Sequence, residues 1–210
     1  MLDNKVVLIG YSGHGLVVAD SAIKGHMNLQ YYTDREEKLN NPFNLNYLGF
    51  EGDYTLDDWE KPYSFILGIG DNSTRKKIAQ LLISKNKKIL NVIDSVCSIS
   101  EFIRIGQGNF IGKNVAINIR SDIGDYCILN TGCVVEHDCR IADGVHIGPG
   151  AVLCGNVVVG EQTFVGANST IMEGVKIGSG VILGAGSVVL KDIPDNETWV
   201  GNPARKIIKS

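Results

Sequence analysis

Residues 123–148 read IGDYCI LNTGCV VEHDCR IADGVH IG, and an aliphatic residue opens each group of six. The pattern runs without insertion from Ile93 to Pro194, and the first position of all seventeen hexads is Ile, Leu or Val. These three types make up 60 of the 210 residues, so chance would fill about five of the seventeen positions. A period of six is neither helical nor simple strand alternation, and it predicts a parallel β-helix built on hexapeptides.

The period also predicts the geometry of the repeat. Three hexads should make one triangular coil of eighteen residues, so seventeen hexads give between five and six coils. Each coil has three short strands whose branched aliphatic residue points inward, and coils stack at about 4.8 Å, the ordinary spacing of paired strands. The inward residues then form continuous columns that make the core. Eight second positions are glycine, which suits the corners between strands.

Length and charge limit the possible functions. The chain of 210 residues divides into residues 1–92, the repeat at 93–194 and a tail at 195–210. The net charge is −3 with no basic run, which argues against nucleic-acid binding. The sequence has no apolar run of about eighteen residues and no signal peptide, so neither a membrane span nor export is predicted. We therefore expect a cytoplasmic protein.

The first 25 residues resemble the opening of a nucleotide-binding α/β unit. KVVLIG (residues 5–10) predicts a buried strand, YSGHG (residues 11–15) a turn, and Leu16–Ile23 a helix. The amide groups at such a helix start suit a phosphate. The glycines do not follow the G-x-G-x-x-G spacing, so a plain NAD site is disfavoured. A purely structural strand-to-helix turn is the alternative.

The rest of this part predicts a small Rossmann-like sheet. We expect strands at residues 29–32, 64–69 and 87–92, a helix at 73–84 and a loop at 40–58. The carboxyl ends of parallel strands converge on one rim, where ligands bind in open α/β sheets. That rim should carry three groups from distant parts of the chain, namely Gly10–His14, Asp34 and Gly70–Asn72. Asp34 is placed to meet a ribose or a base, although a lone Asp equally suits a turn.

Four of the five cysteines occupy one position of the repeat. They stand fifth in their hexads, where Val, Ala and Ser also occur: Cys97, Cys127, Cys133 and Cys139. This placement predicts small buried residues that fill space rather than a metal site or disulfides.

The repeat contains two histidines, His137 and His146. His137 stands third in its hexad, at a corner, so it should face outward. Its neighbour Asp138 could fix the tautomer of the imidazole or raise its basicity. On these residues alone, a solvated surface histidine is an equally good interpretation.

Three motifs resemble one family. GYSGHGL (residues 10–16), NTGCVVEHDC (130–139) and VGNPARKI (200–207) are similar to motifs of bacterial nucleotide-amino-sugar N-acetyltransferases, which are grouped with the sialic acid O-acetyltransferase family. The resemblance covers nearly the whole chain. It implies a Rossmann-like domain followed by a left-handed β-helix, acetyl-CoA as donor, no metal, and a role in surface-glycan synthesis.

The resemblance also implies residue roles. His137 would be the general base, with Asp138 supporting it where some relatives have the longer Glu. His146 would contact the acetyl group or thioester of acetyl-CoA. The pantetheine arm would meet the backbone amides of two alanines, and the nucleotide sugar would meet a set of residues in the first part. These two sets are Ala167 and Ala185 for the cofactor, and Ser12, Gly13, His14, Asp34 and Gly70 for the substrate.

Counting in eighteens tests these roles. Ala167 and Ala185 are one coil apart, so their amides should stack on one edge and suit an extended pantetheine arm. His137 stands half a coil before His146 and should lie on the far side of that coil. One subunit therefore cannot place both histidines in one pocket. We predict a cyclic homotrimer whose active sites lie between subunits, with His137 from one and His146 with the amides from its neighbour.

The predicted reaction is direct acetyl transfer to the amine of a nucleotide-linked amino sugar, with a 4-amino-4,6-dideoxysugar as the expected type. O-acetylation of a sialic acid or another sugar is the alternative within the family, whereas serine or maltose acetyltransferases do not explain the SGHG turn. A hexapeptide-fold carbonic anhydrase would need three histidines on zinc, and only two are present in the coils. A non-catalytic nucleotide-sugar-binding module is the remaining class. The sequence leaves the base and the sugar open.

Overall fold

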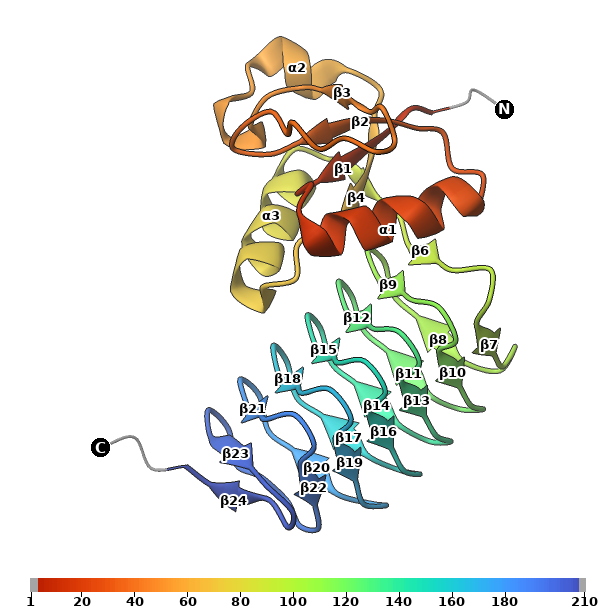
Figure 1. Cartoon of the computed structure of the whole chain (residues 1–210), viewed down its shortest axis with the longest axis vertical. Helices are drawn as coiled ribbons and strands as arrows, with labels where there is room; N and C mark the ends of the chain where they lie inside the picture. The colour runs from red at the N-terminus through yellow and green to blue at the C-terminus, as the bar shows by residue number, and fades with distance from the viewer. Residues whose placement is uncertain (1–3, 208–210) are drawn as a thin grey trace.

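The computed structural model describes residues 4–207, apart from the side chains of residues 56 and 57. Figure 1 shows a small α/β domain lying against one side of a long stack of coils, near its N-terminal end. The predicted fold class is confirmed: a Rossmann-like domain precedes a left-handed parallel β-helix.

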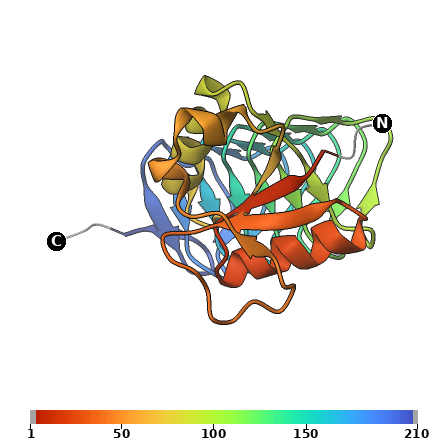
Figure 2. The same cartoon turned by 90° about the horizontal axis from the view of Figure 1, so that it is seen from above.

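The N-terminal sheet has five parallel strands in the order β3-β2-β1-β4-β5. Its strands are β1 (Val6–Ile9), β2 (Leu29–Thr33), β3 (Asn46–Tyr47), β4 (Ser64–Leu67) and β5 (Lys88–Ile89). Its helices are α1 (Gly13–Lys24), α2 (Leu56–Glu60) and α3 (Asn72–Ser84), with a short 3-10 turn, η1 (Glu51–Asp53). Helix α1 packs on one face of the sheet, between the sheet and the first coils, whereas α2 and α3 pack on the opposite face (Figure 2).

Three sequence expectations need correction. The strand predicted at residues 87–92 is divided between β5 and β6 (Val92–Ile93), which belong to different sheets. Helix α1 begins at Gly13, three residues earlier than predicted, so the SGHG turn supplies its first turn. The segment 40–58 is not only loop, because it contains β3, η1 and the start of α2. Helix α2 is fixed by a capping box in which Thr55 and Asp58 bond each other's backbone amides, a local device that hydrophobic periodicity does not reveal.

The coils confirm the eighteen-residue period. Val134 pairs with Ala116 before it and Val152 after it, and the same step recurs along all three faces. Face B, which meets the N-terminal domain, consists of β6 (Val92–Ile93), β9 (Phe110–Ile111), β12 (Ile128–Leu129), β15 (His146–Ile147), β18 (Phe164–Val165), β21 (Ile182–Leu183), β23 (Thr198–Val200) and β24 (Arg205–Lys206). Face C consists of β7 (Ser98–Ile99), β10 (Ala116–Ile117), β13 (Val134–Val135), β16 (Val152–Leu153), β19 (Thr170–Ile171) and β22 (Val188–Val189). Face D consists of β8 (Arg104–Ile105), β11 (Asp122–Ile123), β14 (Arg140–Ile141), β17 (Val158–Val159) and β20 (Lys176–Ile177).

The first positions of the hexads build the core of the coils, as predicted. From Ile111 to Val189 each of them is at most 3% exposed. The three first positions of the opening coil are the exceptions, because this coil has no coil on its other side: Ile93 is 41% exposed, and Ile99 and Ile105 are half-buried. Cys127, Cys133 and Cys139 are fully buried in the core, as predicted, whereas Cys97, in the first coil, is only half-buried.

The far end of the stack departs from the hexads. Trp199 pairs with Leu183 and Ile193 bridges Ile177, a step of sixteen residues instead of eighteen. The predicted tail is therefore partly structured: β23 continues face B and β24 folds back antiparallel to it. The buried Trp199 and Ala204 cover the end of the core.

The domain is fixed to face B. Outward side chains of the first coils, Val92, Phe110 and Ile128, are buried with Val18 and Ala22 of α1 in one apolar cluster. Figure 2 shows the domain lying over the coils when seen from above.

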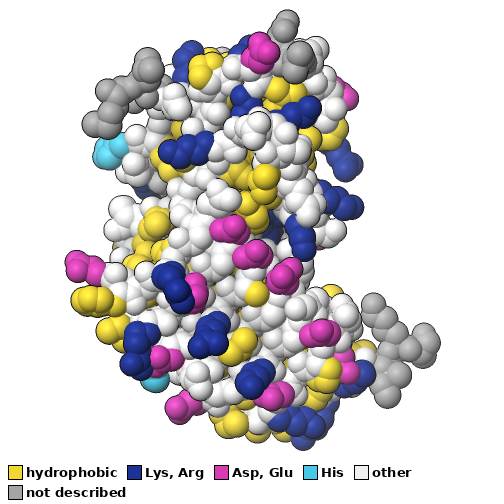
Figure 3. Space-filling view, turned by 180° about the vertical axis from the view of Figure 1, so that it is seen from behind, with side chains coloured by type: hydrophobic (Ala, Val, Ile, Leu, Met, Phe, Trp, Pro, Cys, Tyr) yellow, Lys and Arg dark blue, Asp and Glu magenta, His cyan; other side chains and the backbone are white. Residues whose placement is uncertain are grey.

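No helix in the described part of the chain is long and apolar enough to cross a membrane. Basic and acidic side chains are interspersed over the coils on the face seen in Figure 3, with no large patch of one sign there.

Candidate active site

The rim of the N-terminal sheet forms a pocket of about 380 Å³. Two helix starts reach it, that of α1 at Ser12 and that of α3 at Asp71. Ser12 makes no side-chain capping bond, so its hydroxyl is available to a ligand. Arg35 and Lys38 add positive charge at the same pocket. Helix starts and cations together suit the phosphates of a nucleotide.

Asp34 fixes the shape of this pocket. Its carboxylate accepts hydrogen bonds from the amides of Tyr11 at 2.9 Å and Arg35 at 2.7 Å, and it pairs with Lys38 at 3.3 Å. It therefore ties the loop after β1 to the loop after β2. The structure brings together Ser12, Asp34 and Gly70 of the predicted substrate residues.

The other two predicted substrate residues, Gly13 and His14, do not line that pocket. The His14 ring points toward the coils, edge-on to Phe110 and 6.3 Å between centroids from His146. Its Nε2 atom is buried and has no hydrogen-bond partner among the described residues. Burial, followed by the charge of Arg75, lowers the pKa of His14 to about 4, so the ring is neutral at pH 7.

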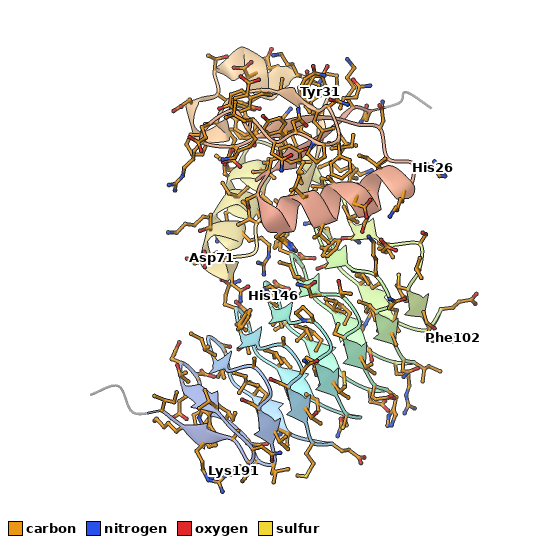
Figure 4. All side chains as sticks on the ribbon, viewed as in Figure 1. His26, Tyr31, Asp71, Phe102, His146 and Lys191 are labelled. Atoms are coloured by element: carbon orange, nitrogen blue, oxygen red, sulfur yellow. The ribbon has the colours of Figure 1, made fainter. Side chains whose placement is uncertain are left out.

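His146 lies on face B under the tip of α3, where Asp71 is found (Figure 4). Its Nδ1 atom is 3.3 Å from the carbonyl oxygen of Gly70, which can only accept, so Nδ1 carries the proton. Its Nε2 atom is 3.3 Å from Asn130 Nδ2. The amide of Thr131 donates to Asn130 Oδ1 at 2.8 Å, which leaves Nδ2 as the donor toward His146.

This network describes a neutral imidazole. Burial, and then the charges of Arg75 and His14, lower the pKa of His146 to about 4. His146 therefore connects the N-terminal domain, through Gly70, to the corner between faces B and C, through Asn130.

A second pocket of about 410 Å³ lies between the tip of α3 and face B. Gly70 and Asp71 line both pockets, so the pocket at the rim of the sheet adjoins the one on the coil surface. On the coil side it is lined by Phe164 and Ile182, which follow His146 in register along face B and are 36% and 49% exposed. These apolar side chains provide a surface for the non-polar part of a ligand.

The corner between faces B and C carries the predicted amide ladder. Ala167 and Ala185 occupy this corner in adjacent coils, and the amide of Gly186 bonds the carbonyl of Ala167 at 2.8 Å. Neither alanine amide donates a hydrogen bond within residues 4–207. Pro149 stands at this corner one coil earlier and has no amide hydrogen, so among these three positions the ladder begins at Ala167.

His137 lies at the corner between faces C and D. Its side chain is 51% exposed, which confirms the outward orientation, and its Nδ1 atom is 2.8 Å from Asp138 Oδ2. Arg120 clamps the same carboxylate, with Nε 2.7 Å from Oδ1 and Nη2 2.8 Å from Oδ2. The pKa of Asp138 is lowered by Arg120 first and by His137 second, so the carboxylate is charged and accepts the Nδ1 proton. The Nε2 atom of His137 then keeps its lone pair and can take a proton from a ligand.

The two histidines are on different sides of the chain. His137 lines a polar pocket of about 370 Å³ with Arg104, Arg140 and Glu173, and this pocket shares no residue with the two near His146. No group of three His, Cys, Asp or Glu side chains that could hold a metal is found within residues 4–207.

Sequence reasoning missed two arginines. Arg120 stands eighteen residues before Asp138, so coil counting was able to find it. Arg75 is 1% exposed and donates to carbonyl oxygens of both domains, including Ile69 and Gly70 on one side and Tyr126 and Gly144 on the other. No pattern in the sequence distinguishes Arg75 from the other cations of its helix, because its partners are backbone carbonyl groups and not a carboxylate that the sequence could reveal.

Comparison with known proteins gives matches over both domains. A family model described as the PglD N-terminal domain matches residues 5–82, and one described as bacterial transferase hexapeptide (six repeats) matches residues 120–155 and 156–191. An uncharacterised protein of Acanthamoeba polyphaga mimivirus, L142, is 32% identical over 124 residues, 59% of this chain. The chain spans only 24% of that protein's length.

Solved structures match end to end. A histidine variant of perosamine N-acetyltransferase from Caulobacter crescentus, in complex with CoA and GDP-perosamine, has a TM-score of 0.92 and 33% identity, with 98% of each chain covered. The acetyltransferase domain of PglB from Neisseria gonorrhoeae, in complex with acetyl coenzyme A, has a TM-score of 0.90 and 30% identity, covering 97% of this chain and 99% of that one. WeeI from Acinetobacter baumannii has a TM-score of 0.87 and 27% identity, covering 96% and 99%.

Proposed function

The chain belongs to the family of bacterial nucleotide-amino-sugar acetyltransferases with hexapeptide repeats, and from that premise we propose that it transfers the acetyl group of acetyl-CoA to the amine of a nucleotide-linked amino sugar. The observation that carries the proposal is the continuity of two pockets. A phosphate-binding rim with two helix starts shares Gly70 and Asp71 with a pocket on the coil face, beside His146.

The substrate is proposed to be a 4-amino-4,6-dideoxysugar joined to a nucleoside diphosphate. Ser12, Asp34 and Gly70 line its pocket, and Gly13 helps form the helix start that faces the phosphates. Binding energy from the nucleotide then orients the amine at a distance from the phosphates. We expect the reaction to take place in the cytoplasm. Its product is expected to be used in the synthesis of a cell-surface glycan.

The proposed base is His137. The amine nitrogen attacks the thioester carbonyl, the carbon–sulfur bond breaks, and CoA leaves as the thiol. His137 Nε2 takes the proton that the amine loses, because Asp138 occupies the Nδ1 side, and this proton then passes to the departing sulfur. A base of this kind contributes about 10²- to 10⁴-fold in rate. No step of this scheme uses a metal.

Acetyl-CoA is proposed to bind along the corner between faces B and C. The amides of Ala167 and Ala185 would hold the pantetheine arm, and His146 would lie near the acetyl group. His137 lies at another corner of the same subunit, so the complete site requires His137 from a neighbour. We therefore propose a homotrimer with three sites between subunits, which would be the natural packing of a triangular prism.

One experiment tests the reaction. Purified protein is mixed with acetyl-CoA and a panel of UDP-, dTDP- and GDP-linked 4-amino-4,6-dideoxysugars, and products are identified by mass spectrometry. One amine should gain an acetyl group, and His137→Ala should lose that activity by about 10²-fold or more while keeping its fold. Turnover of sialic acid with no turnover of any amine would favour the O-acetyltransferase alternative. Full activity of His137→Ala would refute the proposed base.

A further inference from the structure

The loop before α2 contributes two neighbouring residues to the nucleotide pocket, Phe50 and Glu51. Phe50 is partly exposed, whereas Glu51 is only 5% exposed. The Oε2 atom of Glu51 is buried and has no hydrogen-bond partner among the described residues. An acceptor buried in this way is costly unless donors reach it.

The other polar groups that line the pocket either suit phosphate oxygens or already have hydrogen-bond partners. The helix starts at Ser12 and Asp71 and the cations Arg35 and Lys38 suit phosphate oxygens. The Asp34 carboxylate already accepts two backbone amides and pairs with Lys38. Among the acidic residues lining the pocket, Asp71 is also occupied, because it caps α3 through Thr74 at 2.8 Å. Glu51 is the lining carboxylate with an unused oxygen.

An ionised carboxylate offers two acceptor oxygens and no donor. It binds best to two donors that lie side by side, which gives a pair of charge-assisted hydrogen bonds. Guanine has such an edge, with N1–H beside the exocyclic N2 amine. Uracil and thymine present one N3–H between two carbonyl oxygens, so the second carboxylate oxygen would face an acceptor. Adenine and cytosine place a ring acceptor beside their amine.

We infer that Glu51 reads the base of the nucleotide, and that the Phe50–Glu51 loop selects guanine over pyrimidines. The carboxylate binds the N1–H and N2–H edge, and the neighbouring Phe50 ring provides an apolar wall for the base. The inference rests on the proposed function, since it names the nucleotide class of that same substrate site.

Tyr54 is the internal competitor for Glu51. Its hydroxyl is also buried without a partner among the described residues. Burial raises the pKa of Tyr54, and the Glu51 carboxylate is the second cause, which places the two groups near each other. If the carboxylate existed only to accept this hydroxyl, it would contribute nothing to the choice of nucleotide.

Nucleotide binding to the full-length protein tests the inference without any acetyl transfer. The affinities of GDP, IDP, UDP and dTDP are measured by calorimetry. GDP should bind about 10- to 100-fold more tightly than UDP or dTDP, the range expected for one bidentate pair. IDP lacks the N2 amine and should fall between them. Glu51→Gln, which puts a donor in place of one acceptor, should reduce the GDP advantage to about threefold or less.

Two controls separate a specific effect from a general one. Glu60→Gln removes the same charge from an exposed residue of the same domain and should leave all four affinities unchanged. Tyr54→Phe removes the competing hydroxyl and should keep the preference for GDP. Equal or tighter binding of UDP or dTDP by the unmodified protein would overturn the inference, as would an unchanged GDP preference in Glu51→Gln. If none of the four nucleotides binds, the proposed function itself fails; if they bind without preference, only the role of Glu51 does.

Discussion

At the scale of single residues, the Asp138 carboxylate determines which nitrogen of His137 is available. It accepts from Nδ1 and is itself clamped by two nitrogens of Arg120. Two side chains in a row thus hold the proposed base, and the outer one, Arg120, balances the charge of Asp138. The arrangement lies on the surface, so its value is in orientation and charge balance rather than in stability.

Changing Asp138 and changing its partner Arg120 should have opposite effects on the pH–rate profile. Asp138→Asn removes the charge that stabilises the imidazolium, so kcat should fall about tenfold and the acidic limb should move to lower pH. Arg120→Gln leaves the carboxylate less balanced, so the acidic limb should move to higher pH. Steady-state rates between pH 5 and 9 measure both.

A matched control is present in the same pocket. Arg104 pairs with Asp122 at 2.8 Å in register on face D and does not touch His137. Arg104→Gln should leave the profile in place. If it moves the acidic limb as far as Arg120→Gln does, the effect is a general surface potential and the clamp has no specific role.

At the scale of elements, the eighteen-residue period made the coils more predictable from the sequence than the parts of the chain that do not repeat. The columns of aliphatic residues repeat, so the register predicted that Ala167 and Ala185 stack and that His137 faces outward. Elements that do not repeat were missed or misplaced. The capping box at Thr55 and the sixteen-residue step before Trp199 are local or terminal features, which periodicity cannot reveal.

The contacts between the domains were also beyond sequence reasoning. From the sequence, Arg75 is expected to be an ordinary exposed cation of a helix. Only the folded structure brings it to carbonyl groups of the coils. The nucleotide pocket was half predicted: its rim follows from where parallel strands end, but Glu51 enters from a segment expected to be loop.

The amide ladder supports a prediction about acetyl-CoA. Gly186 follows Ala185 with a φ of 69°, which fits a turn that favours proline at the position of Ala185. Pro149 already occupies this corner in an earlier coil. Ala185→Pro should therefore fold normally and remove only the N–H. The KM for acetyl-CoA should rise about fivefold, the value of one hydrogen bond, with the KM of the nucleotide sugar unchanged.

Steady-state kinetics with each substrate varied in turn would check this prediction, with thermal unfolding as the test of fold. An unchanged KM for acetyl-CoA in a stable Ala185→Pro protein would remove this amide from the binding site.

At the scale of the whole molecule, the two domains meet through groups that must be neutral or fully bonded. Arg75 uses its guanidinium for carbonyls on both sides, and His14 and His146 lie beside it. Both histidines have a pKa of about 4 in the folded protein, against about 6.5 in an unfolded chain. Between pH 4 and 6.5 the two histidines therefore stay unprotonated in the folded protein, whereas they would bind protons in the unfolded chain.

Acid should weaken this junction in a defined window. Between pH 6.5 and 4 the unfolded chain binds more protons than the folded one, so the free energy of unfolding falls as pH falls and levels off below 4. The loss is as much as about 3 kcal/mol for each histidine. Urea unfolding at several pH values measures it. As the pH falls, the free energy of unfolding of His146→Gln should decrease less than that of the unmodified protein. His26→Asn, which changes an exposed histidine, should show the same decrease as the unmodified protein.

The placement of His137 and the ladder at different corners leads to a test of assembly. Two variants would each lack one half of every site: His137→Ala lacks the base, and Ala167→Pro/Ala185→Pro lacks the amides. If sites form between subunits of a trimer, a mixed trimer contains interfaces where both halves are intact. Every trimer that contains both variants has one complete interface in three, so activity at low acetyl-CoA should recover to about a third of the unmodified level. Variants that are co-expressed and purified by two different tags provide the mixed protein. Activity no greater than the average of the two separate variants would mean that each subunit works alone, and His137 would then have to act on a ligand different from the one bound at the ladder.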